Sequence, residues 1–182
     1  VSNATLHNED EINRKDIRIG DTVLVQRAGD VIPEIVKVIK SKRQVNSFSF
    51  NLPSQCPICN EVVIRVKGDA VHRCMNSLCP AKIQGSIQHF VSKNCMNIDG
   101  LGEKIIKLLL NKKLISNFSD LYILEKEDIA KLDRMGEKSA ANIIDAIESS
   151  KQRTLAKFIN GLGINNIGQN ASKILADYFK ND

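Results

Sequence analysis

Four of the five cysteines fall in two closely spaced pairs, a spacing that is typical of a metal site. Two residues separate Cys56 from Cys59, fourteen separate Cys59 from Cys74, and four separate Cys74 from Cys79. Two such pairs can place four thiolates around one ion, in the tetrahedral arrangement that structural Zn²⁺ prefers. We therefore expect a closed zinc site with a structural role and no open position for catalysis. The alternative is four ordinary reduced cysteines.

The stretch between the two cysteine pairs is expected to form a β-hairpin. Residues 62–66 are rich in β-branched side chains, and they are followed by a turn at Gly68-Asp69 and by residues 70–73 as the second strand. His72 could replace one cysteine as a ligand, although a place on the hairpin surface is the simpler interpretation. Cys95 lies outside the paired spacing, and we expect it to be a small buried residue. His7 and His89 have no partners that the sequence identifies.

A second chemistry is suggested by three related segments, each with the order apolar, two residues, apolar, glycine. These are residues 98–104, 132–138 and 164–170. Their shared glycines, 34 and then 32 residues apart, are Gly102, Gly136 and Gly168. We expect one helix–turn–helix unit to be used three times. Glycine permits a tight turn with positive φ and a close approach of another backbone, and the following helix starts with unpaired N–H groups that can bind a phosphate.

Neighbouring residues strengthen and weaken this phosphate-binding hypothesis. Lys104 and Lys138 follow their glycines by two residues and could add positive charge. Gly100 precedes the first shared glycine by two residues, whereas Arg134 and Asn166 stand at the equivalent places, which weakens the hypothesis for those turns. The alternative is that the shared glycines only end helices in a bundle. Three turns in register favour DNA or RNA backbone binding, with a grip along a duplex in its minor groove.

The cysteines and the glycine turns must be positioned by secondary structure. We expect strands before the cysteines and helices after them. Residues 17–21, 22–27 and 31–39 are predicted strands, with a turn at 28–30 and Pro33 at a strand start or on an edge. Three strands cannot close a sheet, so this part is a small open barrel or lacks upstream strands. Residues 40–55 form a polar connector. Helices are predicted from about residue 84, with apolar side chains at three- and four-residue spacing in 105–110, 143–147 and 174–179.

Composition favours several small modules over one large core. The 182 residues are 4% aromatic and contain no Trp. The net charge of +5 is spread along the chain, so a basic surface has to be built by folding. No secretory signal and no apolar run near the ~20 residues of a membrane span are found, and we expect a reducing compartment. Because the chain starts at Val1 rather than Met, we expect a segment upstream of it.

Three segments at the start of the chain resemble a known domain. Residues 2–8, 19–21 and 27–33 are similar to the oligonucleotide-binding (OB) domain of bacterial NAD-dependent DNA ligases, and the cysteine module and glycine turns follow in that family's order. The resemblance implies a multi-domain α+β chain. Its parts would be a partial OB-fold β-barrel at 1–52, a small four-cysteine zinc finger at 53–82 and an all-α helix-hairpin-helix domain at 83–182 with about three hairpins.

The resemblance also implies a function. The family uses NAD to seal nicks in duplex DNA during replication and repair, and this chain would clamp the nicked duplex. NAD and Mg²⁺ would serve the intact enzyme at sites outside this chain, which is expected to be a monomer in the bacterial cytoplasm, near the nucleoid and away from membranes. Arg27, Val31 and Ile32 match barrel residues that face DNA in the family. Their alternative roles are a salt bridge at a strand end for Arg27 and core packing for Val31 and Ile32.

The family's nucleophile is a lysine in a Lys-x-Asp-Gly motif, and this motif is missing here. The nearest match is 97–100, where Asn97 stands in place of the lysine. An amide cannot act as the amine that bonds AMP, so we expect no catalytic residue and no ligation by this chain alone. Two further hypotheses are a stand-alone zinc-containing helix-hairpin-helix DNA-binding adaptor in repair and a zinc-stabilised scaffold for protein contacts.

Overall fold

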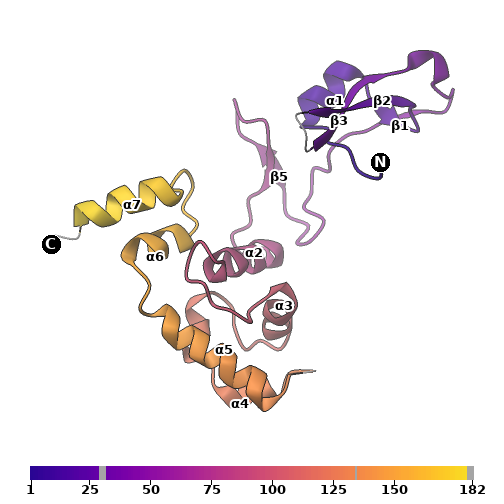
Figure 1. Ribbon diagram of the computed structural model, residues 1–182. Helices are drawn as coiled ribbons and strands as arrows, with labels where there is room; N and C mark the ends of the chain where they lie inside the picture. Colours follow the sequence, from indigo (N-terminus) through magenta and orange to yellow (C-terminus); the bar gives the residue numbers. More distant parts are fainter. Residues whose placement is uncertain (29–31, 134, 180–182) are drawn as a thin grey trace. The chain divides into compact units, whose positions relative to one another are not determined.

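The computed structural model describes residues 1–28, 32–133 and 135–179, and it divides the chain into two compact units (Figure 1). The first unit is Val1–Asn76 and the second is Ser77–Asp182. All strands of the described residues lie in the first unit, and the second is built of helices. The chain is therefore a multi-domain α+β protein, as predicted. None of the described helices has the length and apolar character needed to cross a membrane.

The described residues of the first unit form three small antiparallel sheets of two strands each. The pairs are β1 (Arg18–Ile19) with β4 (Phe48–Ser49), β2 (Val23–Ala28) with β3 (Ile32–Val38), and β5 (Val63–Arg65) with β6 (His72–Cys74). A short 3-10 helix, η1 (Lys40–Lys42), follows β3. No sheet closes into a barrel among the described residues, and the arrangement is compatible with a partial OB-fold.

The predicted strands are present, although the first is shorter than expected. Only residues 18–19 of the predicted 17–21 are strand, and the predicted turn at 28–30 falls largely outside the described residues. Pro33 lies near the start of β3, as predicted for a residue without an N–H group. The edge of β3 away from β2 is paired with Thr5, whose N–H donates to the Pro33 carbonyl oxygen at 2.7 Å and whose carbonyl accepts from Ile35 N at 3.3 Å.

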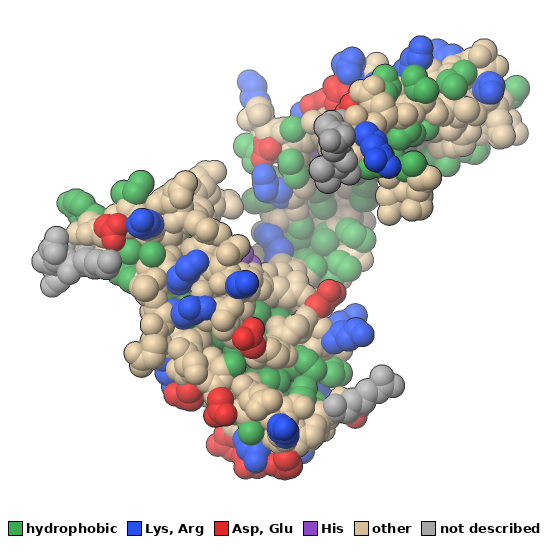
Figure 2. All heavy atoms as spheres, in the orientation of Figure 1, with side chains coloured by type: hydrophobic (Ala, Val, Ile, Leu, Met, Phe, Trp, Pro, Cys, Tyr) green, Lys and Arg blue, Asp and Glu red, His purple; other side chains and the backbone are tan. Residues whose placement is uncertain are grey.

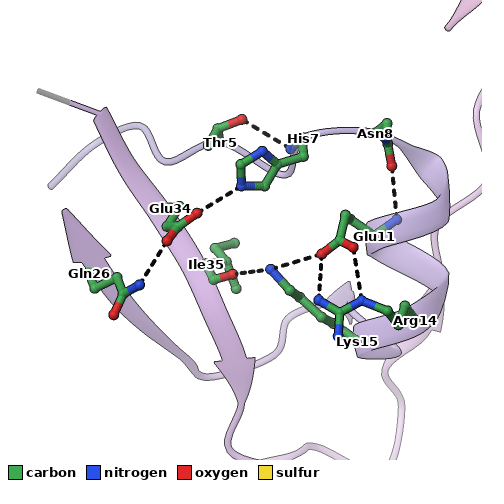
Figure 3. Close-up of polar contacts among 9 residues, drawn as sticks. All are labelled: Thr5, His7, Asn8, Glu11, Arg14, Lys15, Gln26, Glu34 and Ile35. Carbon is green, nitrogen blue, oxygen red and sulfur yellow. Dashed lines mark hydrogen bonds and ion pairs between the residues drawn. The ribbon is translucent and has the colours of Figure 1, made fainter. Parts of the chain in front are cut away.

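Helix α1 (Glu9–Lys15) was not predicted, although its start carries a sequence signal (Figure 3). Asn8 is the N-cap, and its side-chain oxygen accepts from the Glu11 N–H at 3.0 Å. The first turn is acidic and the last turn is basic, which suits the helix dipole. Lys15 Nζ donates to the Ile35 carbonyl oxygen at 2.7 Å and so ties α1 to β3.

Arg43 joins the end of α1 to the turn that precedes β2. Its Nη1 lies 2.7 Å from Asp16 Oδ2, and its Nε lies 2.8 Å from Asp21 Oδ1. The guanidinium group lowers the pKa of both carboxyl groups, and they raise the pKa of Arg43 in return. The Asp21 side chain is 1% exposed, so this ion pair lies inside the unit.

The second unit has six α-helices and one 3-10 helix among the described residues. These are α2 (Pro80–Val91), α3 (Glu103–Asn111), η2 (Ser119–Ile123), α4 (Lys126–Ala130), α5 (Glu137–Ser150), α6 (Leu155–Gly161) and α7 (Gln169–Tyr178). Helices α3, α5 and α7 confirm the predicted apolar spacing. One apolar core runs from Ile87 to Ile147, and Phe90 is fully buried in it, stacked on Phe118 with ring centroids 4.5 Å apart.

Candidate zinc site and nucleic-acid interface

The four paired cysteines converge as the sequence predicts. The sulfur atoms of Cys56, Cys59, Cys74 and Cys79 all lie within 4.8 Å of one another. Cys59 Sγ and Cys74 Sγ are 3.5 Å apart. Sulfur atoms bound to one Zn²⁺ at about 2.3 Å in a tetrahedron are separated by about 3.8 Å. The donor set and its spacing therefore fit a structural zinc ion held by four thiolates.

Local backbone geometry places these sulfur atoms. At the first pair, Asn60 adopts φ 59° and its N–H donates to the Cys56 carbonyl oxygen at 2.9 Å, which forms a tight knuckle. The predicted hairpin is present as β5 and β6, with Gly68 at φ 88° in the turn. Cys74 ends β6, and Cys79 is the N-cap of α2 and is 1% exposed.

Two of the four thiols have pKa values shifted in opposite directions. Backbone N–H groups of Cys59 and Ile58 lower the pKa of the Cys56 thiol to about 7. Burial raises the pKa of Cys74 to about 11. A coordinated Zn²⁺ keeps its thiol ligands deprotonated, so it would offset the cost of burying Cys74 as a thiolate. Cys95 is fully buried and apart from the cluster, as predicted.

His72 contacts helix α1 rather than completing the metal site. Its Nε2 lies 3.4 Å from Glu9 Oε2, and 22% of its side chain is exposed, so it is more covered than a surface position would be. On the same hairpin, Arg65 forms a two-pronged ion pair with Asp10, in which Nη1 donates to Oδ1 at 2.7 Å. The Arg65–Asp10 ion pair and the His72–Glu9 contact thus connect α1 to the zinc hairpin.

The three shared glycines occupy the same position in three pairs of helices. Gly102, Gly136 and Gly168 are the N-caps of α3, α5 and α7. They therefore do not end the preceding helices, and that alternative is wrong. Their φ angles are −74°, −96° and −86°, so the expected positive φ is also wrong for these residues. Positive φ occurs two residues earlier, at Gly100 (89°) and Asn166 (65°), while the equivalent Arg134 lies outside the described residues.

The shared glycines face open space. Among the residues that the structure describes, a Cβ atom added to Gly102, Gly136 or Gly168 would meet nothing within 4 Å, and no side chain caps the helix that follows. Gly100 differs, because an added Cβ would lie 2.8 Å from Ile143 Cγ1 on α5. Packing and backbone conformation within the chain therefore explain Gly100. They do not explain the three N-cap glycines, which leave helix N–H groups accessible to a ligand.

Charge is distributed unequally among the three turns. Lys104 and Lys138 are exposed in the first turns of α3 and α5, each next to a glutamate. Helix α7 begins instead with uncharged Gln169 and Asn170. Figure 2 shows acidic and basic side chains mixed around α4, and lysines and arginines near α6.

Two of the three candidate OB residues, Arg27 and Ile32, are exposed to solvent. Arg27 is exposed and forms no ion pair with any residue that the structure describes, and Ile32 is 57% exposed. Neither the salt bridge nor core packing therefore accounts for these two residues, and Val31 lies outside the described residues. The register pairs Arg27 with Pro33 and Ala28 with Ile32. Since cross-strand partners share a face and successive residues alternate, Arg27 and Ile32 project from opposite faces of the β2–β3 ribbon.

Sequence reasoning missed the partners of two histidines. His7 Nε2 lies 2.9 Å from Glu34 Oε2 (Figure 3). His89 Nε2 lies 2.8 Å from the carbonyl oxygen of Asn160, 71 positions away. Neither contact has a local sequence signal, because the partner is brought close only by the fold.

Comparison with known protein families gives three matches along the chain. The model of the NAD-dependent DNA ligase OB-fold domain matches residues 1–47. The model of the NAD-dependent DNA ligase C4 zinc finger domain matches residues 55–81. The model of a SAM-like helix-hairpin-helix tandem matches residues 94–149.

Curated proteins with similar sequences carry the name DNA ligase. The match in Clostridioides difficile is 57% identical and covers 99% of this chain and 27% of the relative. Matches in Halothermothrix orenii and Bdellovibrio bacteriovorus are 55% and 52% identical, covering 99% and 98% of this chain and 27% and 26% of the relative. The chain therefore spans about a quarter of the length of the curated relatives it matches.

Proposed function

Because the chain corresponds to the OB-fold, C4 zinc-finger and helix-hairpin-helix region of NAD-dependent DNA ligases, we propose that it clamps nicked duplex DNA for a ligase of this family. In the whole protein, nick sealing would use NAD and Mg²⁺ at sites elsewhere, and the adenylated lysine would lie outside this chain. The division into 1–52, 53–82 and 83–182 is part of the proposal. So are a monomeric state, a place in the bacterial cytoplasm near the nucleoid, and roles in replication and repair.

The three N-cap glycines carry this proposal. At each of them a helix of nine or more described residues starts with unpaired N–H groups, and the added Cβ of any other residue would project into open space. A helix N-terminus attracts anions through its N–H groups and its partial positive charge. Contacts of this kind hold the DNA backbone without reading its sequence, which suits a protein that acts on nicks anywhere in a genome.

The strand ribbon adds a second contact to the proposed clamp. Arg27 and Ile32 lie at the same end of β2–β3 but on opposite faces. Both can touch DNA at once if the ribbon enters a widened minor groove by its tip. Arg27 would then pair with phosphate, and Ile32 would pack against sugars.

The proposal is tested by measuring duplex affinity with fluorescence anisotropy. Replacing the exposed N-cap Gly102 with Val should weaken binding to nicked duplex about three- to tenfold, because a β-branched side chain covers the N–H groups that a phosphate would approach. Zinc content should not change. The matched control is Gly85→Ala in α2, where an added Cβ also meets nothing within 4 Å but no helix begins.

Three results would count against the proposal. If the wild-type chain ignores duplex DNA at low salt, the scaffold hypothesis replaces it. Equal affinities for wild type and Gly102→Val would leave that glycine without a binding role. An AMP adduct on the chain after incubation with NAD, detected by mass spectrometry, would contradict the placement of the nucleophile elsewhere.

A further inference from the structure

A hollow of about 550 Å³ lies beside the turn between α6 and α7. Ser86 and His89 of α2 line it from one side, and residues 160–168 line the rest. None of these residues is a lysine, arginine, aspartate or glutamate, so His89 is the titratable side chain of the hollow. The hollow includes Gly168, the N-cap of α7.

The His89 ring is fixed by contacts on one edge. Its Nε2 lies 2.8 Å from the Asn160 carbonyl oxygen and 3.6 Å from Cys95 Sγ. Its Cδ2 would lie 3.5 Å from a Cβ added to Gly163. Because a carbonyl oxygen only accepts hydrogen bonds, Nε2 carries the proton in both charge states of the ring. Protonation therefore takes place at Nδ1, which has no hydrogen-bond partner among the described residues.

The third turn lacks the cation that the other two possess. Lys104 and Lys138 stand two residues after their N-cap glycines, but Asn170 occupies the equivalent place after Gly168. The first turn of α7 also lacks the glutamate that opens α3 and α5. A phosphate at this turn would meet backbone N–H groups and one side chain able to become positive, which is His89 from the neighbouring helix.

We propose that His89 is a phosphate-binding residue of the third hairpin, and that it makes the grip of this hairpin on DNA tighter as the pH falls through the neutral range. This inference rests on the proposed function. A neutral ring presents a lone pair at Nδ1, which cannot donate to a phosphate oxygen. A protonated ring donates an N–H there and adds a positive charge, so binding of the phosphate and uptake of the proton favour each other.

The charged groups that the structure describes near the His89 ring include no carboxylate that could pair with it in place of a phosphate. Helix α2 has Lys82 and no acidic residue. On α6, Lys157 Nζ donates to the Asn94 carbonyl oxygen at 3.0 Å, and on α7 Lys173 and Asp177 line a different hollow. The Cys95 thiol is the titratable group in direct contact with the ring. No carboxylate forms an ion pair with His89 in the part of the chain that the structure describes.

The test compares duplex affinity of the zinc-loaded chain at about pH 6 and about pH 8, a range in which histidine is the usual side chain to change charge. At constant ionic strength the wild type should bind about five- to tenfold more tightly at the lower pH, since one linked proton gives at most a tenfold change per pH unit. His89→Gln should remove most of this dependence and keep the zinc content. His7→Gln, which removes a histidine paired with Glu34 in the first unit, should retain it.

A second measurement does not depend on a variant. Nitrogen NMR of the His89 ring should show the Nε2–H form in the free chain and a larger protonated fraction at neutral pH after duplex is added. An unchanged ring signal, or an equal pH dependence in His89→Gln, would overturn the role of His89 while leaving duplex binding intact. If the wild-type chain does not bind duplex DNA at any pH, the proposed function itself is refuted. If inorganic phosphate alone changes the ring at low concentration as duplex does, the site is one for free phosphate and the DNA assignment is wrong.

Discussion

Glycine serves two different purposes at neighbouring positions of one turn. Gly100 is needed inside the protein, because its φ is 89° and an added Cβ would lie only 2.8 Å from Ile143 Cγ1. Gly102 has an ordinary extended backbone and open space around it. In the third turn Asn166 adopts the left-handed conformation in place of a glycine, as asparagine does more readily than most residues. Asn166 therefore keeps the backbone conformation of the turn, and the weaker phosphate binding expected for this turn from sequence stays a prediction.

The internal role of Gly100 gives a prediction about stability. Gly100→Ala should destabilise the second unit by about 1–3 kcal/mol, from the contact with Ile143 and from the positive φ. In an Ile143→Ala background the added cost should be smaller, because the side chain in the way has been removed. Urea unfolding of the four proteins in this cycle measures the coupling. An added cost that is equal in both backgrounds would show that the Ile143 contact is unimportant.

At the scale of elements, the sequence predicts features that depend on neighbouring residues. It does not predict contacts between residues that are far apart in the chain. The zinc hairpin was predicted from cysteine spacing and a Gly-Asp turn, and the helices from apolar spacing. Helix α1 could have been predicted from Asn8 and the acidic turn that follows. Arg43 gave no such signal, because its partners Asp16 and Asp21 lie 27 and 22 residues away and are brought together only by the fold.

The Arg43 cluster predicts a specific dependence of stability on pH. Arg43 lowers the folded-state pKa of Asp16 and Asp21 below 3.8. Their contribution to stability is therefore complete above about pH 5 and is lost as the pH falls through the folded-state values. Arg43→Ala should lower the urea midpoint at neutral pH. It should also make the decrease of stability below about pH 5 smaller than in the wild type. Arg14→Ala, which removes an exposed pair with Glu11, should lower the midpoint far less.

Zinc removal should act first on the element with the least apolar core. With a chelator, backbone exchange should increase in residues 56–79 before it increases in the core around Phe90, because so small a module depends on its metal to fold. Cys59→Ser should reduce the bound zinc to well below one ion per chain. Cys95→Ala, at the buried fifth cysteine, should keep one ion. Zinc should also be released as the pH falls, since protons compete for the thiolates. Insensitivity of circular dichroism and proteolysis to the chelator would refute the metal site.

At the scale of the whole molecule, the order of parts was more predictable than their contacts. Two cysteine pairs and a repeat of 34 and 32 residues are enough to divide the chain into strand, metal and helix regions. Whether each shared glycine ends one helix or begins the next could not be predicted, because glycine occurs at both helix ends. The hydrogen bond between His89 and the Asn160 carbonyl oxygen could not be predicted either, because nothing in the sequence around a histidine identifies a distant partner.

The proposed clamp predicts how affinity depends on salt. Each phosphate neutralised by a lysine adds about 0.9 to the slope of log affinity against log salt. Lys104→Ala and Lys138→Ala should therefore each reduce the slope by about one unit. Lys151→Ala, at the opposite end of α5 from Lys138 and paired with Glu148, should leave it unchanged. Equal slopes for all four proteins would mean that the lysines of the turns do not contact phosphate.

The contacts of Arg65 and His72 with α1 make this helix a remote reporter of metal occupancy. Arg65 and His72 face each other across β5–β6, and they contact Asp10 and Glu9 on a helix more than fifty positions upstream. When the hairpin loosens, these contacts are lost together. A fluorophore at residue 14, which is exposed on α1, would then register the departure of the ion without touching a ligand. Such a probe could follow metal loading in real time while the protein folds.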